Sequence, residues 1–185
     1  MNSVNTVPTV ATPKLLKVSS DYRNRIYWNQ VKNASGYRVY RKKEGSSSWT
    51  IIENTSAAAY RYTDSNAVPG QTYIYTVRAK TILNGKTIWS GFDPKGLKAK
   101  ASIKTPVLKS AKAVAYNKIQ VTWEAVSGAT AYRVYRKTAG GGWKSVAYLR
   151  NSVSSFGDTG IVTGASYTYT VRACRKINGK NYYGG

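Results

Sequence analysis

Apolar and polar residues alternate with a period of two along several short stretches of the chain. Ile119, Val121 and Trp123 alternate with polar neighbours, and residues 73–79 place tyrosine, valine and alanine at every second position. Such alternation over β-branched and aromatic residues predicts half-buried β-strands. We find no stretch with the 3.6-residue period of a helix, so the chain is predicted to be all-β.

Turn-forming residues separate these stretches. Lysine, asparagine and glycine cluster at 32–36, Pro69 is followed by Gly70, and Asn-Gly pairs occur at 84–85 and 178–179. An Asn-Gly pair favours the type I′ turn that closes a two-residue hairpin. Short strands joined by such turns, several within about 90 residues, predict an antiparallel β-sandwich.

The sequence also repeats itself, at an offset of 95 residues that later becomes 94. Residues 26–42 align with 121–137 at 9 identical positions of 17, including the run YRVYRK. Residues 70–80 align with 164–174 at 7 identical positions of 11, including YTVRA. A repeat of this length and identity predicts two homologous modules.

The boundaries of the modules follow from Thr-Pro pairs that open each repeat. The last strand of the first module is expected at 96–100. The second module stops at Gly185, the counterpart of Gly91, so its own last strand is expected to be missing. The predicted organisation is an N-terminal linker at 1–11, a first module at 12–102, a short linker at 103–106 and a second module at 107–185.

Three features of each repeat occur in a familiar combination. A tryptophan stands on the second predicted strand (Trp28 and Trp123), a Tyr-Arg-Val-Tyr run at 37–40 makes the third, and Tyr73 and Tyr167 precede a late strand. Each module thereby resembles a fibronectin type III domain in its bacterial extracellular variety. The resemblance implies two tandem immunoglobulin-like antiparallel β-sandwiches, with Tyr73 and Tyr167 as tyrosine-corner residues.

The resemblance also implies a role. It points to a non-catalytic spacer, adhesion or presentation unit of a larger bacterial secreted or cell-surface protein, whose other domains are expected partners. The expected localisation is extracellular or at the cell surface. Residues 1–13 have no basic region and no apolar run, so the signal peptide is expected outside this sequence. Nowhere do about 18 apolar residues follow one another, so no membrane span is expected.

Composition narrows the chemistry. The 185 residues include 29 Lys and Arg, 7 Asp and Glu, one Cys and no His. A disulfide scaffold, a zinc site built on several thiolates and a histidine general base are therefore excluded. Only Asp64 and Asp158 occupy equivalent places among the acids, where turn hydrogen bonding is favoured. We expect no enzymatic activity, no cofactor and no metal, and we interpret Cys174, the counterpart of Lys80, as incidental.

The net charge of +22 is shared by both modules, since residues 12–104 carry 17 basic and 5 acidic side chains and residues 105–185 carry 12 and 2. Such a surface attracts anionic partners in a salt-dependent way. The alternative function is therefore a binding module for anionic glycans or cell-wall polymer. Nucleic acid is less favoured, because the charge is spread over both modules instead of one face.

Candidate ligand contacts come from the outward positions of two neighbouring predicted strands and from aromatics that follow the Asn-Gly hairpins. A solvated face that blocks aggregation, with the hairpin aromatics packed over the end of the sandwich, is the competing interpretation. Trp49 and Trp143 are also paired between modules and are expected to cover an edge. The candidate contacts are Arg38, Tyr40, Lys42, Arg78, Lys80, Trp89, Phe92, Arg133, Tyr135, Lys137, Arg172, Tyr182 and Tyr183.

Overall fold

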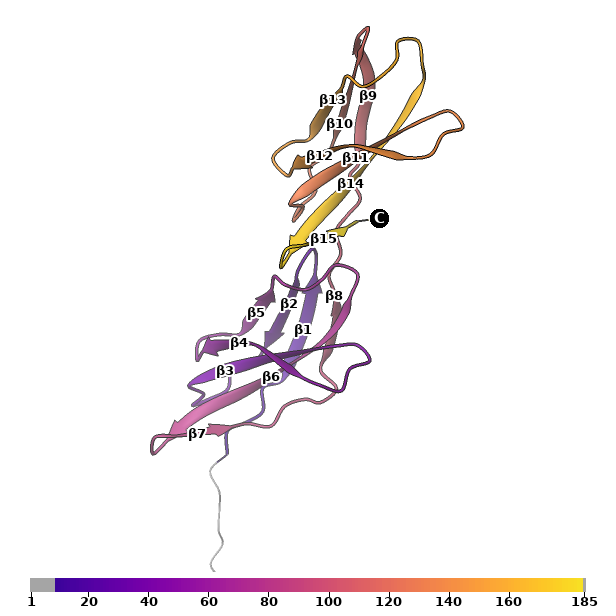
Figure 1. The fold of residues 1–185 in the computed structure, drawn as a ribbon. Coiled ribbons are helices and arrows are strands. Elements are labelled where there is room, and N and C mark those ends of the chain that lie inside the picture. The colour runs from indigo at the N-terminus through magenta and orange to yellow at the C-terminus, as the bar shows by residue number, and fades with distance from the viewer. Residues whose placement is uncertain (1–8, 185) are drawn as a thin grey trace, which may run out of the picture. The chain divides into compact units, whose positions relative to one another are not determined.

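The computed structural model describes residues 9–184 and divides the chain into two compact units, Met1–Ala101 and Ser102–Gly185 (Figure 1). Within the described residues every regular element is a β-strand, and all strand pairs are antiparallel. The predicted all-β fold class is therefore confirmed.

The first unit has two sheets. One has the order β1-β2-β5, and the other has the order β4-β3-β6-β7 with β8 paired to the first part of β6. The final strand predicted at 96–100 is present as β8. The strands are β1 (Leu15–Ser20), β2 (Asn24–Trp28), β3 (Gly36–Lys43), β4 (Thr50–Ser56), β5 (Arg61–Asp64), β6 (Thr72–Leu83), β7 (Lys86–Trp89) and β8 (Leu97–Lys100).

The second unit repeats this arrangement. Its sheets have the orders β13-β10-β9 and β12-β11-β14-β15. Within residues 102–184 no strand pairs with β14 in the way that β8 pairs with β6. The strands are β9 (Leu108–Ala115), β10 (Lys118–Trp123), β11 (Ala131–Thr138), β12 (Lys144–Arg150), β13 (Ser155–Asp158), β14 (Tyr167–Ile177) and β15 (Lys180–Tyr183).

Each unit closes its own hydrophobic core. Trp28 and Trp123 are buried at equivalent places, and their rings lie 5.6 Å and 5.4 Å from those of Tyr37 and Tyr132. Alternate residues of a strand face the same side, which is why the period-two pattern gathers these aromatics between the sheets. Their predicted inward positions are confirmed.

The predicted hairpin turns are confirmed as well. Asn84 and Gly85, between β6 and β7, have φ angles of 50° and 72°, and Asn178 and Gly179, between β14 and β15, have 48° and 80°. Positive φ at both central residues defines the type I′ turn, which asparagine and glycine tolerate better than other residues.

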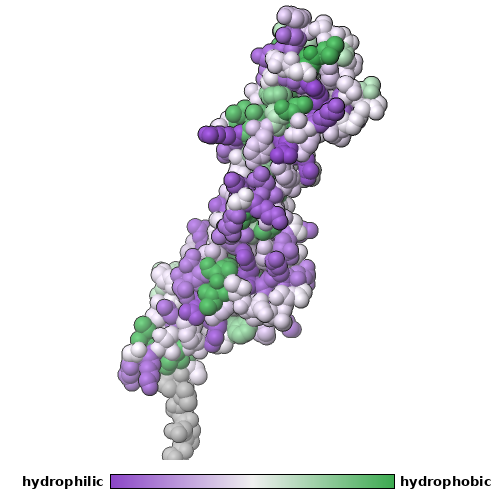
Figure 2. Space-filling model, in the orientation of Figure 1, coloured by the Kyte–Doolittle hydropathy of each residue, from purple (hydrophilic) through white to green (hydrophobic). Residues whose placement is uncertain are grey.

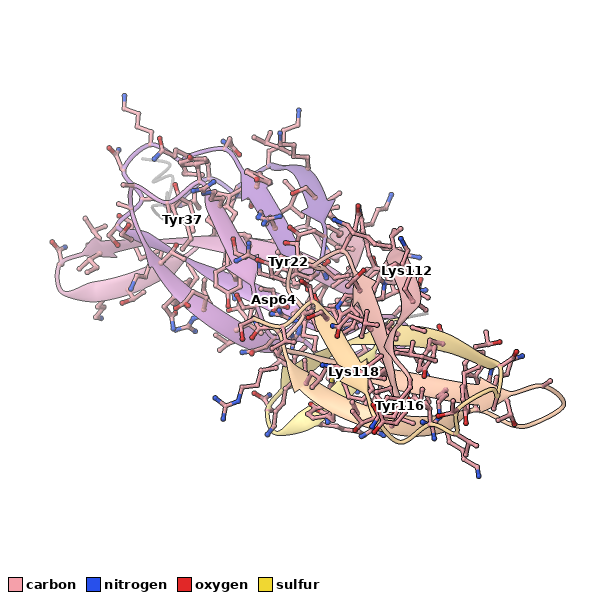
Figure 3. The ribbon with its side chains drawn as sticks, turned by 90° about the horizontal axis from the view of Figure 1, so that it is seen from above. Tyr22, Tyr37, Asp64, Lys112, Tyr116 and Lys118 are labelled. Carbon is pink, nitrogen blue, oxygen red and sulfur yellow. The ribbon has the colours of Figure 1, made fainter. Side chains whose placement is uncertain are left out.

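A buried carboxylate links the two sheets of the first unit. Asp64 ends β5, and its Oδ2 accepts hydrogen bonds from Arg41 Nη1 on β3 (2.6 Å) and from the Tyr75 hydroxyl on β6 (2.7 Å). Its Oδ1 accepts from the Asn66 amide at 3.0 Å, which confirms the turn bond expected there. Figure 3 shows Asp64 near Tyr22, close to the start of β2.

The second unit has the same device. Asp158 Oδ2 accepts from Arg136 Nη1 at 2.8 Å and from the Tyr169 hydroxyl at 2.9 Å, while Oδ1 accepts from the Gly160 amide at 2.9 Å. A buried charge is stable only when it is paired and hydrogen-bonded. Each of the two equivalent acids therefore connects the two sheets of its own unit.

Two residues from the predicted linkers pack into the cores. Most of the linker expected at 1–11 lies outside the described residues, but Val10 is buried in the core of the first unit. Ile103, in the linker expected at 103–106, is buried in the core of the second unit.

Candidate binding surface

The candidate contacts of the first unit lie on the outer face of its β4-β3-β6-β7 sheet. In the β3–β6 ladder Arg38 is opposite Arg78, and Tyr40 is opposite Thr76. Val39, between the two β3 positions, is fully buried in the core. Since neighbouring residues of a strand face opposite sides, Arg38, Tyr40 and Arg78 share the outer surface.

Trp89 lies under two arginines on this face. The guanidinium carbons of Arg38 and Arg78 are 4.2 Å and 5.8 Å from its ring centroid, within the range of cation–π contact. Arg78 Nε also donates to the Ser90 carbonyl at 2.7 Å, and Arg38 Nε donates to Asn54 Oδ1 at 2.8 Å. The structure thus places Trp89 on the outer face of the sheet, in contact with the arginines of two strands.

A small pocket opens beside this stack, in the first unit. Its volume is about 170 Å³, and its walls are almost entirely apolar. The residues that line it are Tyr40, Trp49, Thr76, Arg78 and Phe92. The structure therefore brings three of the candidate contacts, Tyr40, Arg78 and Phe92, around one cavity.

The segment between β7 and β8 closes the pocket. Phe92 meets Trp49 edge to face, with ring centroids 6.0 Å apart, and Lys42 Nζ lies 4.7 Å from the Trp49 ring. Thr76 is only 1% exposed although it points outward, because its hydroxyl donates to the Asp93 carbonyl at 2.8 Å. The connection folds back over the outer face of β6.

The second unit repeats the stack of arginines on an aromatic ring. Arg133 and Arg172 lie 5.5 Å and 5.4 Å from the ring of Tyr183, the counterpart of Trp89. Arg133 also lies 5.4 Å from the Tyr148 ring. Arg172 donates to the Gly184 carbonyl from both Nε and Nη2, at 3.1 Å and 2.8 Å.

The other candidates make looser contacts. Lys137 Nζ lies 4.9 Å from the ring of Trp143, whose side chain is 46% exposed. Tyr182 lies 6.0 Å from Lys180 Nζ. Lys80 is opposite Trp89 in the β6–β7 ladder, and Tyr135 is opposite Thr170 in the β11–β14 ladder.

Two residues that line the pocket, Trp49 and Thr76, are not among the candidate contacts predicted from the sequence. The sequence predicts that Trp49 covers an edge, and it assigns no functional role to Thr76. A signal for Trp49 is present, because both repeats place a lysine six or seven residues before the tryptophan (Lys42 with Trp49, Lys137 with Trp143). Thr76 is buried because the connection between β7 and β8 returns over it, and no residue pattern near Thr76 predicts that return.

Cys174 is buried on β14, beside Tyr148, with 3.8 Å between its Sγ and the tyrosine hydroxyl. Its neighbour Ala173 packs in the core, so Cys174 faces the other side of the sheet. Burial, and then the hydrogen bond with Cys174, raise the pKa of Tyr148.

Figure 2 shows polar residues over most of the visible face of each unit, with separate apolar patches among them. Within residues 9–184 no three acidic, cysteine or histidine side chains gather where they could hold a metal ion. The same part of the chain has no helix with the length and apolar character needed to cross a bilayer.

The strand order of each unit, a three-stranded sheet packed on a larger sheet, is that of an immunoglobulin-like sandwich of the fibronectin type III kind, as predicted. Solved structures with a similar fold include a two-domain fibronectin type III segment from chicken tenascin, 14% identical, which covers 96% of this chain and 98% of that chain with a TM-score of 0.48. The FN1–FN3 domains of chicken CNTN1 are 22% identical, with coverage of 98% and 64% and a TM-score of 0.39.

A third similar structure is a beta-1,2-glucanase from Parabacteroides distasonis, 20% identical, with coverage of 54% of this chain and 14% of that chain and a TM-score of 0.42. No family model and no curated protein match the sequence. At these identities the likeness concerns the fold.

Proposed function

We propose that the chain is a non-catalytic pair of modules that acts as a spacer and as an adhesion or presentation unit in a larger secreted or cell-surface protein. The observation that carries this proposal is the duplicated architecture, in which each unit closes a separate core. Asp64 and Asp158, the acids at equivalent places, use both carboxylate oxygens to hold their own sandwich. This supports a mechanical role for them in place of a chemical one.

Pulling on the two ends of the chain tests the spacer role. Two independent sandwiches give two separate unfolding events in single-molecule force spectroscopy. Each event should release about 80–100 residues of chain, or roughly 260–360 Å of contour length at about 3.3–3.6 Å per residue. A single cooperative event, or one unit that extends without resistance, would contradict the proposal.

A second candidate function is the binding of anionic glycans or cell-wall polymer. The observation that favours it is the arginine–aromatic stack found on both units, Arg38 and Arg78 with Trp89 and Arg133 and Arg172 with Tyr183. Guanidinium groups bind phosphate and sulfate in a bidentate way, and aromatic faces add contact area.

The test compares variants of equal charge on an array of sulfated glycans and teichoic acid. Changing Arg38 and Arg78 to glutamine should weaken binding at low salt at least about tenfold, against a smaller loss for glutamine at Lys17 and Lys32. Equal losses in the two variants would mean that total charge alone attracts the polymer, which contradicts a defined site.

A further inference from the structure

The pocket of the first unit matches the size of one ring. A cavity of about 150 Å³ with apolar walls holds a benzene molecule in a protein interior. The pocket, at about 170 Å³, has room for one six-membered ring and little more. The edge-to-face contact between Trp49 and Phe92 fixes two of its walls.

The polar groups at the pocket are few. The Thr76 hydroxyl already donates to the Asp93 carbonyl, and Arg78 Nε already donates to the Ser90 carbonyl. It is Nε of Arg78 that makes this bond, so an anion at the rim would meet the N–H groups of the terminal nitrogens. Lys42, beside the outer wall, is a second cation within reach of the rim.

This inventory disfavours a sugar ring. A pyranose carries hydroxyl groups on most of its carbons, and these outnumber the polar groups of the lining that could replace water, namely the Tyr40 hydroxyl, the Trp49 indole N–H and the Arg78 terminal nitrogens. A ring that is apolar throughout, with one carboxylate beside it, leaves no polar group unpaired. An aromatic side chain next to an aspartate or glutamate has this chemistry.

We infer that the pocket of Tyr40, Trp49, Thr76, Arg78 and Phe92 binds an aromatic side chain of an acidic peptide segment in a partner protein. The ring enters the pocket, and the neighbouring carboxylate pairs with Arg78 and Lys42. An aromatic anchor that fills a small pocket is a common form of interaction hot spot. The excess of 17 basic over 5 acidic side chains at 12–104 supplies charge complementarity.

The inference rests on the proposed adhesive role in one respect, which is that the chain must meet a partner protein. The second unit offers a matched control, because Trp143, the counterpart of Trp49, is 46% exposed and stacks with Lys137. A change at Trp143 removes the same side chain at the equivalent place of the other module.

The probe is a capped pentapeptide with phenylalanine between two acidic pairs, titrated into the whole chain and followed by NMR and calorimetry. The amide shifts should concentrate at the pocket residues. A peptide with alanine at the centre should bind at least tenfold more weakly. Trp49→Ala and Phe92→Ala should each weaken binding of the phenylalanine peptide at least tenfold, and Trp143→Ala should leave it unchanged.

The thermal stability of each variant is measured in the same samples, so that loss of binding can be distinguished from unfolding. Phe92 is 38% exposed, so Phe92→Ala should lower the melting temperature of the first unit less than truncation of a fully buried aromatic residue does, and the first unit should stay folded at the temperature of the titration. Lys42→Gln provides a second variant that leaves the apolar walls in place, and it should weaken binding several-fold. All these variants should keep the two unfolding events under force, so that failure of the pocket and failure of the spacer role give different results.

Three outcomes would overturn the inference. The first is an absence of measurable binding by the phenylalanine peptide. The second is equal affinity for the peptides with phenylalanine and alanine, which would mean that charge alone is recognised. The third is a sulfated or uronate hexasaccharide that shifts the pocket residues more strongly than the peptide at the same salt concentration, which would assign the site to a glycan.

Discussion

Replacing Asp64 by asparagine removes one charge from the first unit while the side chain keeps its size. In the native protein Asp64 Oδ2 accepts from Arg41 Nη1 and from the Tyr75 hydroxyl, and the Asp64 side chain is 2% exposed. Asparagine leaves the Arg41 guanidinium without its counter-charge. Asparagine also has one acceptor oxygen where aspartate has two, so its NH2 group must face either the Arg41 and Tyr75 donors or the Asn66 amide.

The expected cost follows from the burial of the pair. Removing one partner of a buried ion pair costs about 3–5 kcal/mol. The Arg41 side chain is 21% exposed, so water can solvate its unpaired charge and offset part of this cost. We expect a loss of about 2–4 kcal/mol, which corresponds to a fall in the melting temperature of the first unit of at least about 8 °C for a domain of this size.

The assay must report each unit separately. Hydrogen exchange with mass spectrometry across a thermal or urea series does this, because peptides from 12–101 and from 102–184 are read independently. Asp158→Asn is the matched variant in the second unit, where the same contacts recur, and it should destabilise only that unit.

Asp21→Asn is the charge control. Its partner is Arg25, at 2.9 Å, but the Asp21 side chain is 42% exposed, and exposed pairs contribute less than about 1 kcal/mol. All three variants change the net charge by the same amount. A loss for Asp64→Asn that is no larger than that for Asp21→Asn would refute the role of the buried pair, as would equal destabilisation of both units by one variant.

Four substitutions, one of them the Asp21→Asn control, test the separate cores and the ionisation of Tyr75 and Asp21. Trp28→Ala and Trp123→Ala should each cost about 3–5 kcal/mol by urea unfolding and destabilise only the unit that holds them, because the cores do not share side chains. Burial, and then the Asp64 carboxylate, raise the pKa of the Tyr75 hydroxyl. The contribution of Tyr75 is therefore complete below the pKa of an unfolded tyrosine, about 10, and is lost as pH rises above it, so Tyr75→Phe should flatten the alkaline fall of the unfolding free energy. Burial raises the pKa of Asp21, but the hydrogen bonds from the Arg23 amide and the Arg25 guanidinium together lower it by more. The pKa of Asp21 therefore lies below its ordinary value. The contribution of Asp21 is present above about pH 4 and lost as pH falls through the folded pKa, and Asp21→Asn should remove that part of the acid dependence in urea titrations between about pH 5 and pH 2.

The sequence predicts those parts of the fold that are determined by residues close together in the chain. Strand alternation places Trp28 and Trp123 inside because the side chain period of a strand is two, and Asn84 with Gly85 makes a type I′ turn because both tolerate positive φ. The repeat adds independent support, since each feature is read twice at a fixed offset.

The candidate surface depends on contacts that have no such local cause. Alternation predicts that Thr76 points outward, which it does, but its burial comes from Asp93 in the connection after β7. Trp49 lies just before β4 and reaches Phe92 across the sheet, 43 positions later in the chain. Contacts between residues this far apart in the chain depend on the course of the connecting segments. Neither the alternation of apolar residues nor the turn residues predict that course.

Some residues of the outer face are the same in both units, and others differ. Arg38 and Arg78 recur as Arg133 and Arg172, and in each unit one of them donates to the backbone after the hairpin aromatic. A stack that recurs with internal hydrogen bonds stabilises the sheet wherever it occurs, so it cannot by itself make one unit recognise a ligand that the other ignores. The ring of the stack is not shared, because the first unit has Trp89 where the second has Tyr183, and in the first unit Trp49 also contacts Phe92. A ligand that enters the pocket of the first unit should therefore respond more strongly to Phe92→Ala than to Arg38→Gln, which leaves the pocket lining unchanged.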